Sequence, residues 1–147
     1  MINRLEPPRL AGTFEQVKSW LQQAYRRFVQ IDSGSFTGTL TGMTASTTGT
    51  VDYTIIGDIV TLSIASNITG TSNATTMTMT GMPADLWPSG SRYVFARLRD
   101  NTTGTLQGLT AIDSSGTITF SYGITSGLAF TAANTKGLLT CTMVYKQ

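Results

Sequence analysis

The spacing of the hydrophobic residues changes once along this chain, close to residue 31. Before that point apolar side chains recur every three or four residues, at Phe14, Val17, Leu21, Ala24, Phe28 and Ile31. This spacing is typical of one face of an amphipathic helix. After Gly34 the chain is rich in Thr, Ser and Gly, and apolar residues alternate with polar ones in short runs, as in half-buried strands. The pattern predicts one helix over 14–31 and then a β domain.

The predicted helix must bury its apolar stripe against something, because an isolated helix of this length is marginal in water. Trp20 and Tyr25 add a second apolar edge beside the stripe. The stripe can pack on the β domain, or it can associate with copies of itself as a short coiled coil, since a heptad and a 3.6-residue repeat are hard to separate over so few turns. We favour self-association, with a trimer ahead of a dimer.

Alternating runs predict about eight strands in the rest of the chain. They cover Ser35–Gly42, Thr50–Ile56, Ile59–Ile64, Thr75–Thr80, Arg92–Arg99, Leu106–Ile112, Thr117–Tyr122 and Gly137–Tyr145. Gly57-Asp58 is a two-residue hairpin signal, and 82–90, with two prolines, is a loop. Short strands separated by regular turn signals predict a mainly β protein with an antiparallel β-sandwich or jelly roll.

The first twelve residues have the composition of an extended arm. Two successive prolines exclude a helix there and favour polyproline-like backbone. Such an arm either lies on a partner or is a disordered terminus. The side chains expected to dock on a partner are Leu5, Pro7, Pro8 and Leu10. The predicted organisation is a docking arm over 1–12, an oligomerisation helix over 13–33 and a β-sandwich tip domain over 34–147.

Charge and overall hydropathy exclude several kinds of partner. Charged residues make up only 12% of the chain and the net charge is +2, without the basic stripe that nucleic acid requires. No run approaches the roughly 20 apolar residues that cross a bilayer, so membrane insertion is not expected. The first residues lack the apolar segment of a secretory signal, which predicts a protein made in a cytoplasm.

The residues that carry most enzyme chemistry are missing or scattered. The chain has no histidine, which excludes Ser-His-Asp and Cys-His nucleophiles and most zinc sites. Its single cysteine, Cys141, allows no intrachain disulfide. The run Asp113-Ser114-Ser115-Gly116 lacks the spaced ligands of a calcium loop and is typical of a turn. We therefore expect no enzymatic activity, no cofactor and no metal.

Large aromatic side chains in loops are the remaining candidates for ligand contact. Trp87 lies in the proline-containing loop, and Tyr122 ends the seventh predicted strand. Each can cover the end of the β core or contact a ligand, since recognition sites on loops often use exposed aromatic side chains. We treat Trp87 and Tyr122 as candidate receptor contacts, with both interpretations open.

Several Thr- and Gly-rich runs resemble the C-terminal β modules of fibres and fibre-like proteins from tailed-bacteriophage and prophage virions. The runs are Ser35–Gly42, Gly49–Thr54, Gly70–Thr76, Gly81–Ala84, Gly127–Ala132 and Lys136–Leu138, and the resemblance covers 34–145. It implies a trimeric, non-enzymatic β-sandwich tip that is displayed on the virion and often touches a glycan or protein of the host surface. Residues 1–31 would then attach to tail or capsid proteins and form the trimer.

The leading hypothesis is thus a short homotrimeric fibre of a phage virion, with a β tip that contacts the host. One alternative is a head decoration fibre or tail adaptor without receptor binding. Another is a free, lectin-like carbohydrate-binding module.

Overall fold

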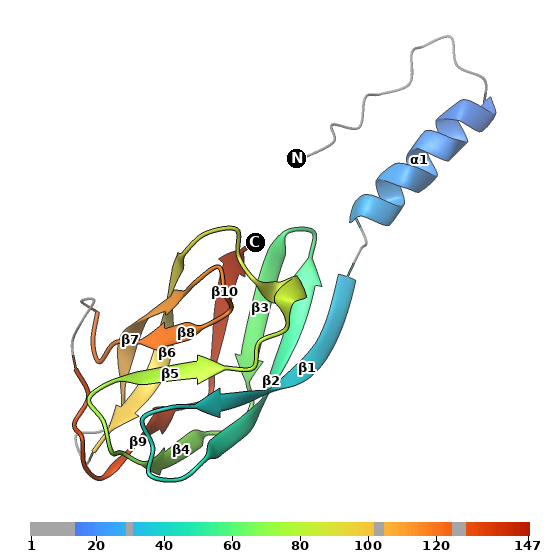
Figure 1. The fold of residues 1–147 in the computed structure, drawn as a ribbon. Helices are drawn as coiled ribbons and strands as arrows, with labels where there is room; N and C mark the ends of the chain where they lie inside the picture. The colour runs from blue at the N-terminus through green and yellow to red at the C-terminus, as the bar shows by residue number, and fades with distance from the viewer. Residues whose placement is uncertain (1–13, 29–30, 102–104, 125–128) are drawn as a thin grey trace.

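The computed structural model describes residues 14–28, 31–101, 105–124 and 129–147. Within these ranges the chain forms one α-helix, ten strands and a short 3-10 helix, η1 (Ala84–Leu86) (Figure 1). The helix is α1 (Phe14–Phe28), and the strands are β1 (Ile31–Leu40), β2 (Thr47–Ile56), β3 (Ile59–Ile64), β4 (Ile68–Thr71), β5 (Met77–Thr80), β6 (Arg92–Asp100), β7 (Thr105–Ile112), β8 (Ile118–Phe120), β9 (Thr135–Leu138) and β10 (Cys141–Lys146). The predicted mainly β class is confirmed.

The strands form one antiparallel sheet that curls around a single core. Its order is β10-β3-β2-β1-β5-β8-β7-β6-β9-β4. The curl brings β10 beside β6, where Nε of Arg92 donates to the carbonyl of Lys146 at 2.8 Å. As a result β10-β3-β2-β1 and β5-β8-β7-β6 face each other as two layers (Figure 1). This is the predicted sandwich or jelly-roll-like arrangement, closed along one side.

The core is built by the alternation that the sequence displays. In β3, Val60, Leu62 and Ile64 point inward and are buried, whereas Thr61 and Ser63 between them are only partly covered. The same period of two places apolar residues of β5, β8 and β10 in the core. Side chains with no exposed surface at all include Val51, Val60, Leu62, Leu98, Ile112, Ile118 and Leu138.

One lysine is buried together with an aspartate at the edge of this core. Lys136 lies opposite Asp100 in the β6–β9 ladder, and its Nζ donates to the carbonyl oxygens of Ala74 at 2.6 Å and Thr76 at 2.8 Å. The Asp100 carboxylate accepts from the amide and the hydroxyl of Thr131, each at 2.9 Å from Oδ2. Burial lowers the pKa of Lys136, and the nearby Asp100 charge opposes that shift. The pair ties two loops to β6.

The helix is shorter than the hydrophobic pattern predicts. α1 ends at Phe28, and Ile31 is the first residue of β1, directly opposite Ile56. The assignments of Ile31 to the helical stripe and of 31–33 to the helical segment are therefore wrong. Gly34 lies inside β1 opposite Tyr53, and a Cβ at this position would overlap the phenol ring. Pairing with β2 along the whole of β1 outweighs the local helical period.

Two further strand assignments change. The expected strand over 137–145 is divided at Leu139-Thr140 into β9, which pairs with β6 and β4, and β10, which pairs with β3. The turn-rich stretch near Gly70 contains β4, which pairs with β9. The Gly57-Asp58 hairpin between β2 and β3 is confirmed, and Gly57 has the positive φ of +63° that this tight turn requires.

The predicted arm lies outside the described residues, as do the docking side chains assigned to it, Leu5, Pro7, Pro8 and Leu10. That assignment stays a prediction. Among the residues that are described, no helix is long and apolar enough to cross a membrane.

Candidate oligomerisation and recognition surfaces

The first candidate surface is the apolar stripe of α1. Phe14 is 79% exposed, Leu21 54% and Tyr25 68%, and Val17 is exposed as well, whereas Ala24 is buried. The side chain of Phe28 is outside the described set. Figure 1 shows α1 projecting away from the β domain, so the strands do not cover this stripe. A helix in water does not keep such a stripe exposed without a partner. The surface is therefore suited to association.

Trp87 combines the two roles considered for it. It directly follows η1, its Nε1 donates to the carbonyl of Met82 at 3.0 Å, and its ring packs on Gly116 so closely that a Cβ there would overlap it. Leu86 beside it is buried. Trp87 thus closes one end of the core. Because 39% of the residue remains exposed, part of the ring is still available to a ligand.

Tyr122 lies at the other end of β8 and is held by the core. It is half-buried, and its ring centroid is 5.7 Å from that of the buried Phe130. Gly116, against which Trp87 packs, precedes β8, whereas Tyr122 follows it. The two aromatic residues predicted as receptor contacts therefore do not form one site. Whether either of them contacts a receptor stays a prediction.

A more exposed group of side chains lies on the outer face of β6. Tyr93 is 66% exposed and Phe95 53%, and Arg97 and Arg99 follow on the same face, while Leu98 between them is buried. Neither guanidinium is in an ion pair with a described residue. We call these four residues, Tyr93, Phe95, Arg97 and Arg99, the β6 stripe. The sequence shows their alternation but does not show which half of it faces the core.

A shallow hollow of about 380 Å³ adjoins the β6 stripe. Its lining includes Phe95, Arg97, Thr105, Gln107, Cys141 and Thr142. Arg97 and Gln107 are directly opposite in the β6–β7 ladder. Burial raises the pKa of the Cys141 thiol, which keeps it protonated and unreactive. The hollow suits the binding of a polar ligand, because it is lined by an aromatic ring, a guanidinium, an amide and hydroxyl groups. These lining residues do not include a nucleophile paired with a general base.

The acidic side chains in the described part of the chain are scattered, and Asp113 serves a turn. Within the described ranges no group of three or more His, Cys, Asp or Glu side chains is placed to hold a metal ion. Asp113 instead accepts hydrogen bonds at Oδ1 from the Ser115 hydroxyl at 2.6 Å and from the amides of Ser115 and Thr117 at 2.8 and 3.0 Å. These bonds, the Ser115 hydroxyl first, lower the pKa of Asp113. The predicted turn is confirmed.

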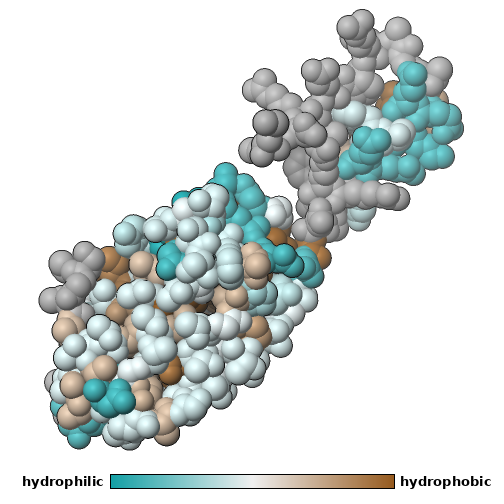
Figure 2. Space-filling view, in the orientation of Figure 1, coloured by the Kyte–Doolittle hydropathy of each residue, from teal (hydrophilic) through white to brown (hydrophobic). Residues whose placement is uncertain are grey.

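The rest of the visible surface is weakly polar. Figure 2 shows a β domain covered mostly by residues of intermediate hydropathy, with hydrophobic residues gathered at the end where β1 begins. This agrees with the low content of charged residues, 12%.

No protein-family model and no curated protein matches this chain. Among solved structures it is similar to a reovirus attachment protein, sigma1, crystallised in complex with α-2,3-sialyllactose, at 16% identity over 82% of this chain and 67% of that chain, with a TM-score of 0.48. It is also similar to the C-terminal receptor-binding domain of the avian reovirus fibre sigmaC in two crystal forms. Their identities are 20% and 19% over 80% and 81% of this chain and 76% of each of those chains, with TM-scores of 0.46 and 0.45. At TM-scores below 0.5, what this chain binds has to be judged from its own residues.

Proposed function

We propose that the protein is a structural protein of a bacteriophage virion, a short fibre of three identical chains. The arm over 1–12 docks on tail or capsid proteins, α1 joins the three copies, and the β domain is the tip that contacts the host surface. The observation that carries this proposal is the exposed apolar stripe of α1, which no strand covers. The Thr- and Gly-rich runs that resemble phage fibre modules support the placement in a virion.

The energetics of α1 favour association. Fully burying a side chain such as Phe14, Leu21 or Tyr25 stabilises by roughly 1.5–3 kcal/mol, so a few such contacts offset the cost of ordering a 15-residue helix. Trp20 and Tyr25 widen the apolar surface beyond a narrow two-helix seam. A wide stripe is covered on both flanks when each helix has two neighbours, and this favours a trimer over a dimer.

The β6 stripe is the surface of the tip best suited to contact the host. Aromatic and arginine side chains dominate the energetics of recognition surfaces. Arg97 and Arg99, without acidic partners among the described residues, favour a ligand that carries negative charge, such as an acidic surface glycan. Trp87 and Tyr122 remain additional candidate contacts. Three tips on one axis would bind a repetitive surface far more tightly than one, because the second and third contacts form within a single complex.

Sedimentation equilibrium of the full chain tests the assembly. At micromolar concentration we expect a species of three times the 15.7 kDa chain mass. A clean monomer at that concentration would overturn the fibre proposal.

An array of bacterial surface polysaccharides, probed with the labelled full chain, tests the tip. We expect binding that falls by about tenfold or more for Phe95→Ala and Arg97→Ala, since each removes a hot-spot type of contact. Thr50→Ala, an exposed residue of β2 in the other layer, is the matched control. Loss of binding with Trp87→Ala alone would move the contact to the loop after η1.

Each of the two alternatives predicts a result that differs from this proposal in one of the two measurements, binding or sedimentation. A head decoration fibre or tail adaptor shares the trimer and the docking arm, and its tip would bind no host polysaccharide or host cell. A free lectin-like module would bind sugar through the β domain and sediment as a monomer. The exposed stripe of α1 argues against the second alternative.

A further inference from the structure

Three isoleucines form an exposed row across the outer face of β1, β2 and β3. Ile31 lies directly opposite Ile56, and Ile56 lies directly opposite Ile59 on the far side of the hairpin turn. All three point away from the core, with exposed fractions of 59%, 52% and 40%. They lie at the end of the sheet that follows α1, where hydrophobic surface gathers in Figure 2. We call them the isoleucine row.

The row differs from the rest of the same outer face. The next positions along the strands are Ser33, Thr54 and Thr61, and those after them are Ser35, Asp52 and Ser63. Threonine satisfies the conformational preference of a strand while presenting a hydroxyl to water, so strand propensity alone does not require isoleucine here. Cross-strand packing accounts for Ile56 and Ile59 beside their turn. Ile31 has the same kind of cross-strand neighbour in Ile56, and yet it is the most exposed of the three.

The short connection to α1 restricts where the row can lie in an assembly. Only two residues separate Phe28 from Ile31, and three Cα steps reach at most about 11 Å. Packed helices lie about 8–10 Å apart. If α1 associates with its copies, each β1 therefore begins close to the shared axis. The surface around Ile31 is forced against its counterparts more strongly than any other part of the β domain.

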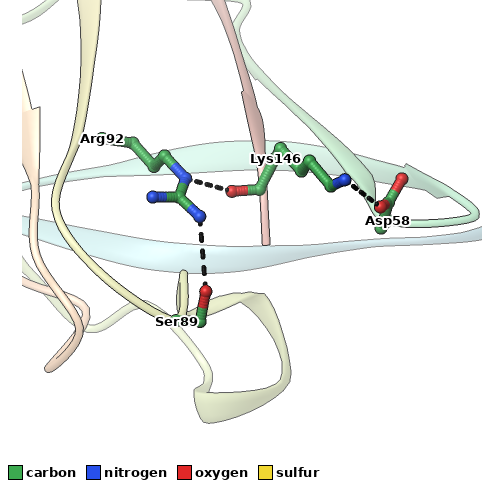
Figure 3. A network of polar contacts seen from close by, with 4 residues as sticks. All are labelled: Asp58, Ser89, Arg92 and Lys146. Carbon is green, nitrogen blue, oxygen red and sulfur yellow. Dashed lines mark hydrogen bonds and ion pairs between the residues drawn. The ribbon is translucent and has the colours of Figure 1, made fainter. Parts of the chain in front are cut away.

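The polar neighbours of the row include one ion pair, whose charges cancel, and the Arg92 guanidinium, which is held by neutral oxygens. Lys146 is opposite Ile59 on the β10 side, and its Nζ is 2.9 Å from Oδ2 of Asp58. The Lys146 carbonyl accepts from Arg92 Nε at 2.8 Å, and Arg92 Nη2 donates to the Ser89 hydroxyl at 3.3 Å (Figure 3). This network fixes the side of the row. The three isoleucines themselves carry no charge, so the same row on another copy can pack against them.

We propose that Ile31, Ile56 and Ile59 form a second contact between copies of this chain, next to the helices, which fixes the β domains against one another around the fibre axis. This inference rests on the proposed association of α1. The interface would then continue from the helix into the sheet. The β domains would be held in one orientation relative to one another, and would not rotate freely about the connection to α1.

Site-specific cross-linking of the full chain tests the contact. The Cys141→Ala background removes the only native thiol, and Ile56→Cys then places one thiol in the row. Thr50→Cys is the matched control, because Thr50 is exposed on the same face of the same strand, six residues away. Under mild oxidation at micromolar protein we expect a disulfide-linked dimer of Ile56→Cys to form on the order of a hundredfold faster than that of Thr50→Cys, because the local thiol concentration within an assembly is millimolar. Its rate should not change on dilution.

Sedimentation of the same samples separates the two ways in which the inference can fail. If the chain is oligomeric and Ile56→Cys reacts no faster than Thr50→Cys, the isoleucine row faces something other than a second copy, and the α1 proposal stands. If the unmodified chain is a monomer, both proposals fall. The conservative Ile56→Thr and Ile59→Thr pair should leave the fold intact and weaken association by about tenfold or more, as expected for two apolar side chains lost from an interface.

Discussion

Helix α1 and the β domain differ in how far their apolar side chains are buried. In the β domain nearly every inward position of the ten strands is buried, and even the one lysine at its core edge has hydrogen-bond partners. In α1 several large apolar side chains are exposed, led by Phe14 and Tyr25, and Trp20 is partly covered. The core of the β domain is packed within one chain. The helix has a pattern that only another surface can complete.

The contacts that hold the fold together and the contacts available for assembly are therefore made by different residues. A substitution in the core of the β domain should change the stability of each chain and leave association alone. A substitution in the stripe of α1 should do the reverse. A variant that changes both the stability of the chain and its association would show that the two are coupled.

The largest effect is expected from Leu21→Lys in the middle of the stripe. It brings one unpaired ammonium group per chain into an apolar interface, which should weaken association by at least about a hundredfold. Sedimentation should show monomers at micromolar concentration. The near-ultraviolet circular dichroism of the β domain should stay unchanged.

Gln23→Lys is the control for that variant, because Gln23 is exposed on α1 outside the stripe. It should sediment like the unmodified chain. Equal weakening by both lysines would mean that charge on the helix, not the stripe, governs association.

The second effect concerns the interior of the β domain. Lys136→Ala removes the donor to the Ala74 and Thr76 carbonyls and leaves Asp100 without its cationic neighbour. Carbonyl groups that lose a buried charged donor cost about 1–3 kcal/mol each in the free energy of unfolding. Urea unfolding followed by Trp87 fluorescence should show it, with no change in the association constant. Lys146→Ala, which truncates an exposed lysine, should be far less destabilising.

The third effect is alkaline destabilisation centred on Tyr145. Burial raises the pKa of Tyr145 to about 12, and its hydroxyl donates to the Leu86 carbonyl at 2.6 Å. The unfolded state releases this proton near pH 10, so stability is complete below that pH and is lost as pH rises through 12. We expect the free energy of unfolding to fall by up to about 2–3 kcal/mol over this range. Tyr145→Phe should flatten that part of the pH profile; an unchanged profile would contradict the assignment.

The smallest effect is expected at the Asp58–Lys146 ion pair, which lies beside the isoleucine row. The hydrogen bond from Lys146 lowers the pKa of Asp58, so its contribution is present above the ordinary carboxyl pKa and is lost as pH falls through the lowered value. Exposure and salt screening keep it small. Carbon-detected NMR titration should show the Asp58 pKa moving back toward its ordinary value in Lys146→Ala, and also at high salt.

Sequence patterns predicted those elements whose cause is local. The hairpin at Gly57-Asp58 follows from a turn that accepts a positive φ, and β3 follows from the strict alternation of its six residues. The stripe of α1 was also recognised, apart from its end. Ile31 fits the helical period as well as it fits a strand, and only its pairing with Ile56 distinguishes the two. The candidate recognition residues were less predictable, since the aromatic residues in loops proved to be anchored whereas those of β6 are exposed.

Hydrophobic spacing, turn residues and the lack of histidine were therefore enough to specify one amphipathic helix, a mainly β body and the absence of histidine-based catalytic chemistry. Packing in three dimensions was needed to establish where the helix ends, that the last strand is divided between two partners, which face of β6 meets solvent, and that Lys136 lies buried beside Asp100. The cause is the range of the forces involved. Periodicity and turn propensity act between neighbours in the chain, whereas burial and strand pairing depend on segments far apart in sequence.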